Sequence, residues 1–110
     1  KAAAEHGAVA APAHPGRPKV GMFAHTDELG IPEGICIVET LNGGSRDDED
    51  QIAKDGAAAN GYKGIGGSDS HIVSHIGRCG TRFENPVRTI DDLVQELKGG
   101  QFEAVGLKEA

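Results

Sequence analysis

The sequence predicts an α/β fold in which strands alternate with helices around a mainly parallel sheet. The stretch "GICIVET" (34–40) is a continuous apolar run of strand length, which indicates a strand buried on both faces. Helical patterns at 47–61 and 89–99 separate this run from further short strands expected at 62–67 and 101–107. Strands alternating with helices are typical of βα units and a parallel sheet.

The remaining elements follow in chain order. Residues 1–6 predict the end of a helix that is closed by Gly7, and residues 8–11 predict a short buried strand. A turn at 15–18 leads to a weakly helical or irregular segment, 19–30. Acidic residues crowd the first turn of the helix at 47–61, where they suit the helix dipole. The last helix has a capping residue, Thr89, with Asp92 three positions later, and a long loop precedes it.

The amino-acid composition and net charge limit which classes of protein this chain can belong to. The chain has 110 residues, 37% of them apolar, with no tryptophan and 17 glycines, so we expect a thin core and many loops. This composition favours part of an enzyme over a compact binding module. The net charge is −6 and no basic run occurs, which excludes strong binding to nucleic acid or acidic membranes and suits a divalent cation better.

The cellular setting follows from what the sequence lacks. No stretch approaches the roughly 20 apolar residues of a membrane span, and the first residues do not read as a signal peptide. Cys36, expected in a buried strand, and Cys79 are far apart and are predicted to be free thiols, which fits the cytoplasm. Because there is no initiator methionine, we expect the chain to begin inside a longer protein.

Polar side chains follow two of the expected strands at the point where each ends. His14 follows the strand at 8–11, and the motif "GGSDSH" places Asp69 and His71 after the strand at 62–67. In parallel α/β folds, the loops that leave the carboxyl ends of strands build the active site. Imidazole and carboxylate groups are ligands for zinc, manganese and iron. We therefore expect a metal site there, with Asp69 and His71 facing the same way if their segment is extended.

Three further residues near these strand ends are candidates for supporting roles. Arg17 could hold a substrate phosphate with two parallel hydrogen bonds, or it could be a surface arginine. Asn42 could bind substrate or hold its own loop. Glu39 could orient a metal-binding histidine, or it could bind loop amides at the end of its strand.

Two motif-based alternatives are weaker. His71 and His75 have the spacing of a helical zinc motif, but Ile72 stands where that motif needs its glutamate. The glycines of "GIGG" (64–67) match neither the Walker nor the dinucleotide spacing, so they are expected to serve the turn at the strand end.

Four blocks of the sequence, in order, resemble the C-terminal half of the PHP (polymerase and histidinol phosphatase) domain family. They are "AHPGRPK", "IVETLNGGSRDDED", "GGSDSHIVSHIGRCGTRFE" and "TIDDLVQELKGGQFEAV". The resemblance covers nearly the whole chain, and "GSDSH" followed by "IGRCGTRFE" is its most specific part.

The resemblance implies that residues 1–110 are the C-terminal portion of a distorted seven-stranded (β/α) barrel with a divalent metal cluster of Zn, Mn or Fe. It implies a phosphoesterase acting on a small-molecule or nucleotide phosphate ester, with His14, Asp69 and His71 as metal ligands and Asp69 and His71 also catalytic. The family's opening His-x-His motif is absent from these residues, so we expect an N-terminal half or a partner chain to supply it. Two alternatives remain: a non-catalytic PHP remnant with a binding or structural role, and an α/β nucleotide-binding regulatory module.

Overall fold

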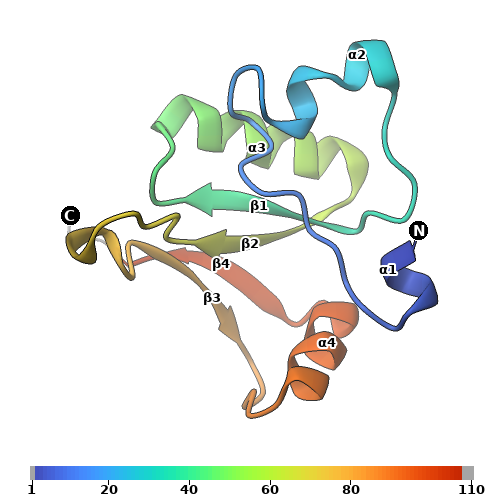
Figure 1. Cartoon of the computed structure of the whole chain (residues 1–110), viewed down its shortest axis with the longest axis vertical. Coiled ribbons are helices and arrows are strands. Elements are labelled where there is room, and N and C mark those ends of the chain that lie inside the picture. Colours follow the sequence, from blue (N-terminus) through green and yellow to red (C-terminus); the bar gives the residue numbers. More distant parts are fainter. Residues whose placement is uncertain (1, 108–110) are drawn as a thin grey trace.

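Two small sheets form the centre of the computed structural model, which describes residues 2–107 (Figure 1). Strand β1 (Ile37–Asn42) pairs with β2 (Lys63–Gly67) in parallel, and β3 (Cys79–Phe83) pairs with β4 (Phe102–Gly106) in antiparallel fashion. The prediction of an α/β class is confirmed. The expectation of a mainly parallel sheet is wrong for the described residues, because the second pair is a β-ribbon with antiparallel strands.

The βαβ unit around β1 matches the sequence-based expectation closely. Helix α3 (Asp47–Asn60) begins with four acidic residues, ends at Gly61 in the left-handed region and lies over one face of β1 and β2 (Figure 1). Val38 is fully buried in β1, as the apolar run predicted. The strand starts three residues later than predicted, because Gly34 makes a turn at φ 80°, and it extends to Asn42.

A β-bulge at Thr40 changes the direction of the side chains at the end of β1. The pairing passes from Glu39 opposite Ile65 to Leu41 opposite Gly66, which leaves Thr40 as the extra residue. In a regular strand, residues 39 and 42 would point to opposite faces. The extra residue restores them to the same side, where their side chains form a hydrogen bond of 2.6 Å.

A side chain of β3 bonds the β3–β4 ribbon to the backbone of the first sheet. Thr81 Oγ1 accepts a hydrogen bond from Gly66 N at 2.9 Å and donates one to Gly66 O at 3.0 Å. A side chain thus satisfies the backbone of β2 where a neighbouring strand would otherwise lie. Strand β3 was expected to be part of a long loop, although its alternating Cys79, Thr81 and Phe83 are compatible with a strand.

The helix predicted at 89–99 is confirmed as α4 (Ile90–Gly99), which connects β3 to β4. Thr89 Oγ1 accepts a hydrogen bond from Asp92 N at 3.0 Å, which confirms the predicted cap. The helix ends at Gly100, in the left-handed region, one residue beyond the expected stop.

Residues 2–30 wrap around this centre with little regular structure. Helix α1 (Ala2–Glu5) precedes Gly7 at φ 72° as expected, while Lys1 lies outside the described residues. The predicted strand at 8–11 is wrong: this segment has no strand pairing, and the nearby contact with β1 is a hydrogen bond from Glu39 N to Pro12 O. The prolines at 12 and 15 lack the N–H groups that a ladder needs.

Short helices complete the described chain. They are η1 (Met22–Ala24), α2 (Thr26–Leu29) and η2 (Val73–His75). Cys36 and Cys79 are free thiols as predicted, but Cys36 is exposed because it precedes β1. None of the helices in the described residues is long and apolar enough to cross a membrane.

Candidate functional site

The candidate site lies where β1 and β2 end side by side. Because the strands are parallel, Asn42 and Gly67 are register partners at the same edge of the sheet. The loops continue this contact, since Gly43 N donates to Gly67 O at 2.9 Å. The loops that follow Asn42 and Gly67 therefore lie side by side at this edge of the sheet.

Glu39 connects this edge to the segment that carries His14. Its Oε1 accepts hydrogen bonds from His14 N at 2.9 Å and from Asn42 Nδ2 at 2.6 Å. The absence of a side chain at Gly67 allows the approach, because a Cβ there would lie 2.7 Å from Glu39 Oε2. Of the two interpretations of Glu39, the structure therefore shows the hydrogen bond to a loop amide.

Arg17 lies at the centre of the cluster. Its Nη2 is 3.1 Å from Asp69 Oδ2, 3.0 Å from Ser45 Oγ and 3.3 Å from Asn42 Oδ1. Its Nε is 3.7 Å from Glu49 Oε1. The side chain of Arg17 is 27% exposed, so it is neither a free surface arginine nor fully enclosed.

Asp69 and His71 are adjacent but do not lie on an extended segment. Asp69 has φ 49°, so the chain turns there, and the expectation of two side chains on one strand face is wrong. His71 Nδ1 is 3.0 Å from the Asp69 carbonyl oxygen and 3.9 Å from Asp69 Oδ1. The His71 side chain is 84% exposed, which places it at the solvent side of the cluster.

The Asp69 carboxylate is held in its ionised form. Burial acts to raise its pKa, but hydrogen bonds from Arg17 and Asn42 and the charges of Arg17 and His71 outweigh burial, so the pKa lies below its ordinary value of 3.8. Gly44 leaves room for this carboxylate, because a Cβ there would be 3.2 Å from Asp69 Oδ2. A carboxyl group must be ionised to serve as a cation ligand.

Ser68 fixes the loop that follows Asp69. Its Oγ accepts a hydrogen bond from Gly77 N at 2.7 Å and donates to Cys79 O at 3.4 Å. The loop also contains His75, but Ile72 is extended and η2 is a short 3-10 helix. His71 and His75 therefore do not share the face of an α-helix, as the zinc-motif alternative would need.

The donor atoms fit a divalent cation in type but not yet in number. His14 Nδ1 is buried and has no hydrogen-bond partner among the described residues, and Asp69 supplies an ionised carboxylate. Within residues 2–107, however, no group of three or more His, Cys, Asp or Glu side chains converges in a way that could hold a metal ion. A cation at this edge would need donors in addition to those that this part of the chain brings together.

Five of the six residues singled out in the sequence belong to one connected network. His14 is linked through Glu39 to Asn42, and Asn42 is linked through Arg17 to Asp69; His71 lies beside Asp69. Sequence reasoning missed Ser45 and Glu49. The sequence indicates only their positions: Ser45 lies in the loop between β1 and α3, and Glu49 lies in the first turn of α3.

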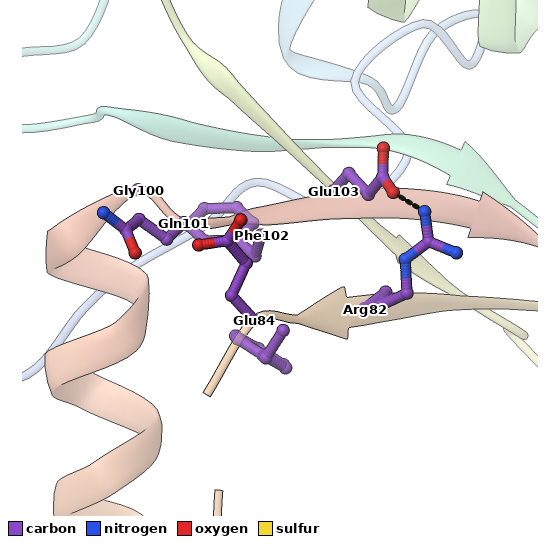
Figure 2. A pocket seen from close by; sticks show the side chains of 7 residues that line it. Arg82, Glu84, Gly100, Gln101, Phe102 and Glu103 are labelled. Carbon is purple, nitrogen blue, oxygen red and sulfur yellow. Dashed lines mark hydrogen bonds and ion pairs between the residues drawn. The ribbon is translucent and has the colours of Figure 1, made fainter. Parts of the chain in front are cut away.

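A separate pocket lies away from this network. Its volume is about 660 Å³. It is lined by one end of the β3–β4 ribbon and by the adjoining residues Glu84, Gly100 and Gln101, with an Arg82–Glu103 ion pair at its wall (Figure 2). None of the network residues lines it. The Arg82–Glu103 ion pair is exposed, and no hydrogen bond described here connects it to the carboxyl ends of β1 and β2. We therefore place the candidate site at the network and not at this pocket.

Comparison with known proteins gives one family match. A family model described as PHP-associated matches residues 49–102, from the first turn of α3 to the start of β4. Asp69 and His71 lie within the matched residues, whereas His14, Arg17 and Asn42 precede them. No curated protein and no solved structure gave a significant match.

Proposed function

We propose that this chain, in which residues 49–102 match a PHP-associated family model, is the C-terminal region of a PHP domain and contributes one side of the active site of a metal-dependent phosphoesterase. The observation that carries the proposal is the network at the carboxyl ends of β1 and β2. It joins the side chains of Arg17, Asn42 and Asp69 and, through Glu39, the backbone of His14. Such strand ends are where α/β enzymes hold their ligands and cofactors.

In the proposed site, Asp69, His14 and His71 hold divalent metal (zinc, manganese or iron). Bound cations of this kind polarise a phosphate and lower the pKa of a bound water. The low pKa of Asp69 supports its role, because the carboxylate is ionised at neutral pH. The buried, unpartnered Nδ1 of His14 also supports it, because such an atom is otherwise unfavourable.

In this proposal Arg17 binds the substrate and Asn42 holds Arg17 in position. A guanidinium group pairs with phosphate oxygens through parallel hydrogen bonds. Asn42 is 2% exposed, and its amide is held by Glu39 and Arg17, so it orients Arg17 more than it reaches solvent. The substrate class is a phosphate ester of a small molecule or nucleotide, and the setting is the cytoplasm.

The remaining metal ligands come from outside the described residues, either from another segment of the protein or from a partner chain. These additional ligands, the His-x-His motif among them, complete the set of metal donors in this proposal. We extend the same reasoning to the fold, where the two small sheets are part of a larger (β/α) barrel.

One observation favours a second candidate, a non-catalytic PHP remnant. The Asp69 carboxylate already has a counter-ion within the chain, Arg17, at 3.1 Å. In a remnant, this ion pair would serve only to hold the loops together.

The change Asp69→Asn separates the two candidates. In the intact protein, we expect it to remove most bound metal and nearly all hydrolysis of an aryl phosphate, because the amide is a poor cation ligand. Asp55→Asn is the matched control, since Asp55 is exposed on α3 and accepts a hydrogen bond only from Gln51 among the contacts described. Full metal content and turnover in Asp69→Asn would contradict the proposal, and a wild-type protein without metal or turnover would favour the remnant.

A further inference from the structure

We propose that Arg78 binds the phosphate group of an organic phosphate ester in a pocket beside the network, with the apolar part of the ester against Ile76 and Leu107. The pocket has a volume of about 460 Å³ and is lined by Ser74, Ile76, Gly77, Arg78 and Leu107. Small-ligand pockets have volumes of roughly 300–1,000 Å³. The inference rests on the proposed function for the choice of a phosphate ester as ligand, and it involves no metal ion.

The pocket borders the candidate site through the loop that follows β1. Arg78 Nη1 donates a hydrogen bond to Gly43 O at 3.4 Å, and Gly43 comes directly after Asn42. Arg17 bonds the side chains of Asn42 and Ser45 in the same loop. Figure 1 shows the segment between β2 and β3 on the side of the molecule to which the arrows of β1 and β2 point. Two guanidinium groups therefore contact one loop at the carboxyl ends of these strands.

Arg78 differs from its neighbour in having no counter-ion. Arg17 and Arg82 each have a carboxylate oxygen within 4 Å, whereas Arg78 has none within residues 2–107. Arg78 is partly buried, and in this part of the chain only Gly43 O occupies any of its five guanidinium N–H donors. None of the described residues that line the pocket is acidic, although the chain has a net charge of −6. An anion would offset the cost of this partly buried charge.

The backbone holds Arg78 in place at the wall of the pocket. Leu107 N donates to Arg78 O at 2.8 Å, and the preceding residue is fixed by a hydrogen bond of 2.7 Å from Gly77 N to Ser68 Oγ. Gly43 allows the close approach of its loop, because a Cβ there would lie 2.8 Å from Arg78 Cβ. Such preorganisation lowers the entropy cost of binding an anion.

Two of the residues that line the pocket are large and apolar, which favours an organic ester over inorganic phosphate. Ile76 is 69% exposed and Leu107 is 59% exposed. An aromatic or other apolar group bound against them would remove this surface from water, which is favourable. The planar guanidinium of Arg78 can pair with two phosphate oxygens at once. The pocket therefore matches a phosphate monoester whose remaining part is apolar.

The test is NMR titration of the intact ¹⁵N-labelled protein with phenyl phosphate and, separately, with inorganic phosphate, in the presence of a chelator that removes metal. Both ligands should shift the amide signals of residues 74–78. Arg78→Gln should weaken both about tenfold or more, because a charge-assisted hydrogen bond is lost, and Arg78→Lys should fall between. Ile76→Ser should weaken phenyl phosphate several-fold and leave inorganic phosphate unchanged. Arg82→Gln is the matched control, because it removes the same charge from an exposed ion pair on the β3–β4 ribbon, and neither affinity should change.

Equal affinity of Arg78→Gln and wild type for phenyl phosphate, or no binding by wild type, would overturn the inference. If Arg78→Gln fails to fold, Ile76→Ser decides, because its side chain is exposed and an unchanged affinity for phenyl phosphate would also overturn it. The proposed function fails separately. Binding of phenyl phosphate without turnover when metal is present would contradict that function alone, whereas turnover with an unchanged KM in Arg78→Gln would overturn this inference alone.

Discussion

Replacement of Glu39 by alanine should destabilise the chain far more than loss of an ordinary surface carboxylate. The change removes the acceptor for two hydrogen bonds, from His14 N at 2.9 Å and from Asn42 Nδ2 at 2.6 Å. Asn42 is 2% exposed, so its amide cannot turn to water for a new partner. A hydrogen bond to a charged group contributes about 1.5–3 kcal/mol, and His14 N can recover part of its share from solvent. We therefore expect a loss of roughly 2–4 kcal/mol in the free energy of unfolding, a large fraction of the stability of a small domain.

Urea unfolding followed by circular dichroism measures this loss. With a typical dependence on urea, the midpoint should fall by about 1–2 M. Glu103→Ala is the matched control, because Glu103 lies in an exposed ion pair with Arg82 and such pairs contribute about 0–1 kcal/mol. Glu39→Gln, which keeps one acceptor oxygen, should fall between the two. A Glu39→Ala midpoint no lower than that of Glu103→Ala would refute the role of Glu39 as the link between the segments.

Two further predictions follow from the same region. Gly67→Ala should destabilise the chain by roughly 1–3 kcal/mol, because the new Cβ would lie 2.7 Å from Glu39 Oε2; urea unfolding tests it, and an unchanged midpoint would contradict the close packing. The second prediction concerns pH. Because the folded-state pKa of Asp69 is lowered, its contribution to stability is fully present above its unfolded pKa near 3.8 and is lost as pH falls through the lower folded value. The difference in unfolding free energy between wild type and Asp69→Asn should therefore shrink between pH 6 and pH 3, and a constant difference would contradict the lowered pKa.

The sequence predicted those parts of the fold that depend on local pattern. The apolar run of β1, the acidic start of α3 and the Thr89 cap of α4 each carry their own signal, and the structure confirms all three. The segment at 8–11 failed because an apolar composition does not guarantee a pairing partner, and prolines follow it. β3 was missed because glycine and arginine interrupt its short pattern.

The candidate site was predictable only to the level of strand ends. Parallel pairing of β1 with β2 brings Asn42 and Asp69 together, as the sequence predicts. Arg17 joins them through its own hydrogen bonds, although the strand expected before it at 8–11 does not form. The bulge at Thr40 carries no sequence signal, yet it turns Asn42 toward Glu39. Composition and hydrophobic periodicity do not predict where a strand carries one extra residue, so they do not predict the contacts that depend on it.

The backbone at two of the predicted ligands has a consequence for how this chain tolerates substitution. Among the described residues, His14 at φ 30° and Asp69 at φ 49° are two of the three non-glycine residues with positive φ. Glycine would relieve strain on the order of 1 kcal/mol at each position, but it would also remove the imidazole and the carboxylate. A variant library sorted for thermal stability alone should therefore enrich glycine at these two positions, whereas a library sorted for metal retention should exclude it. Opposite results of the two selections at these positions would show, without any assay of turnover, that His14 and Asp69 lower the stability of the chain but are needed for metal binding.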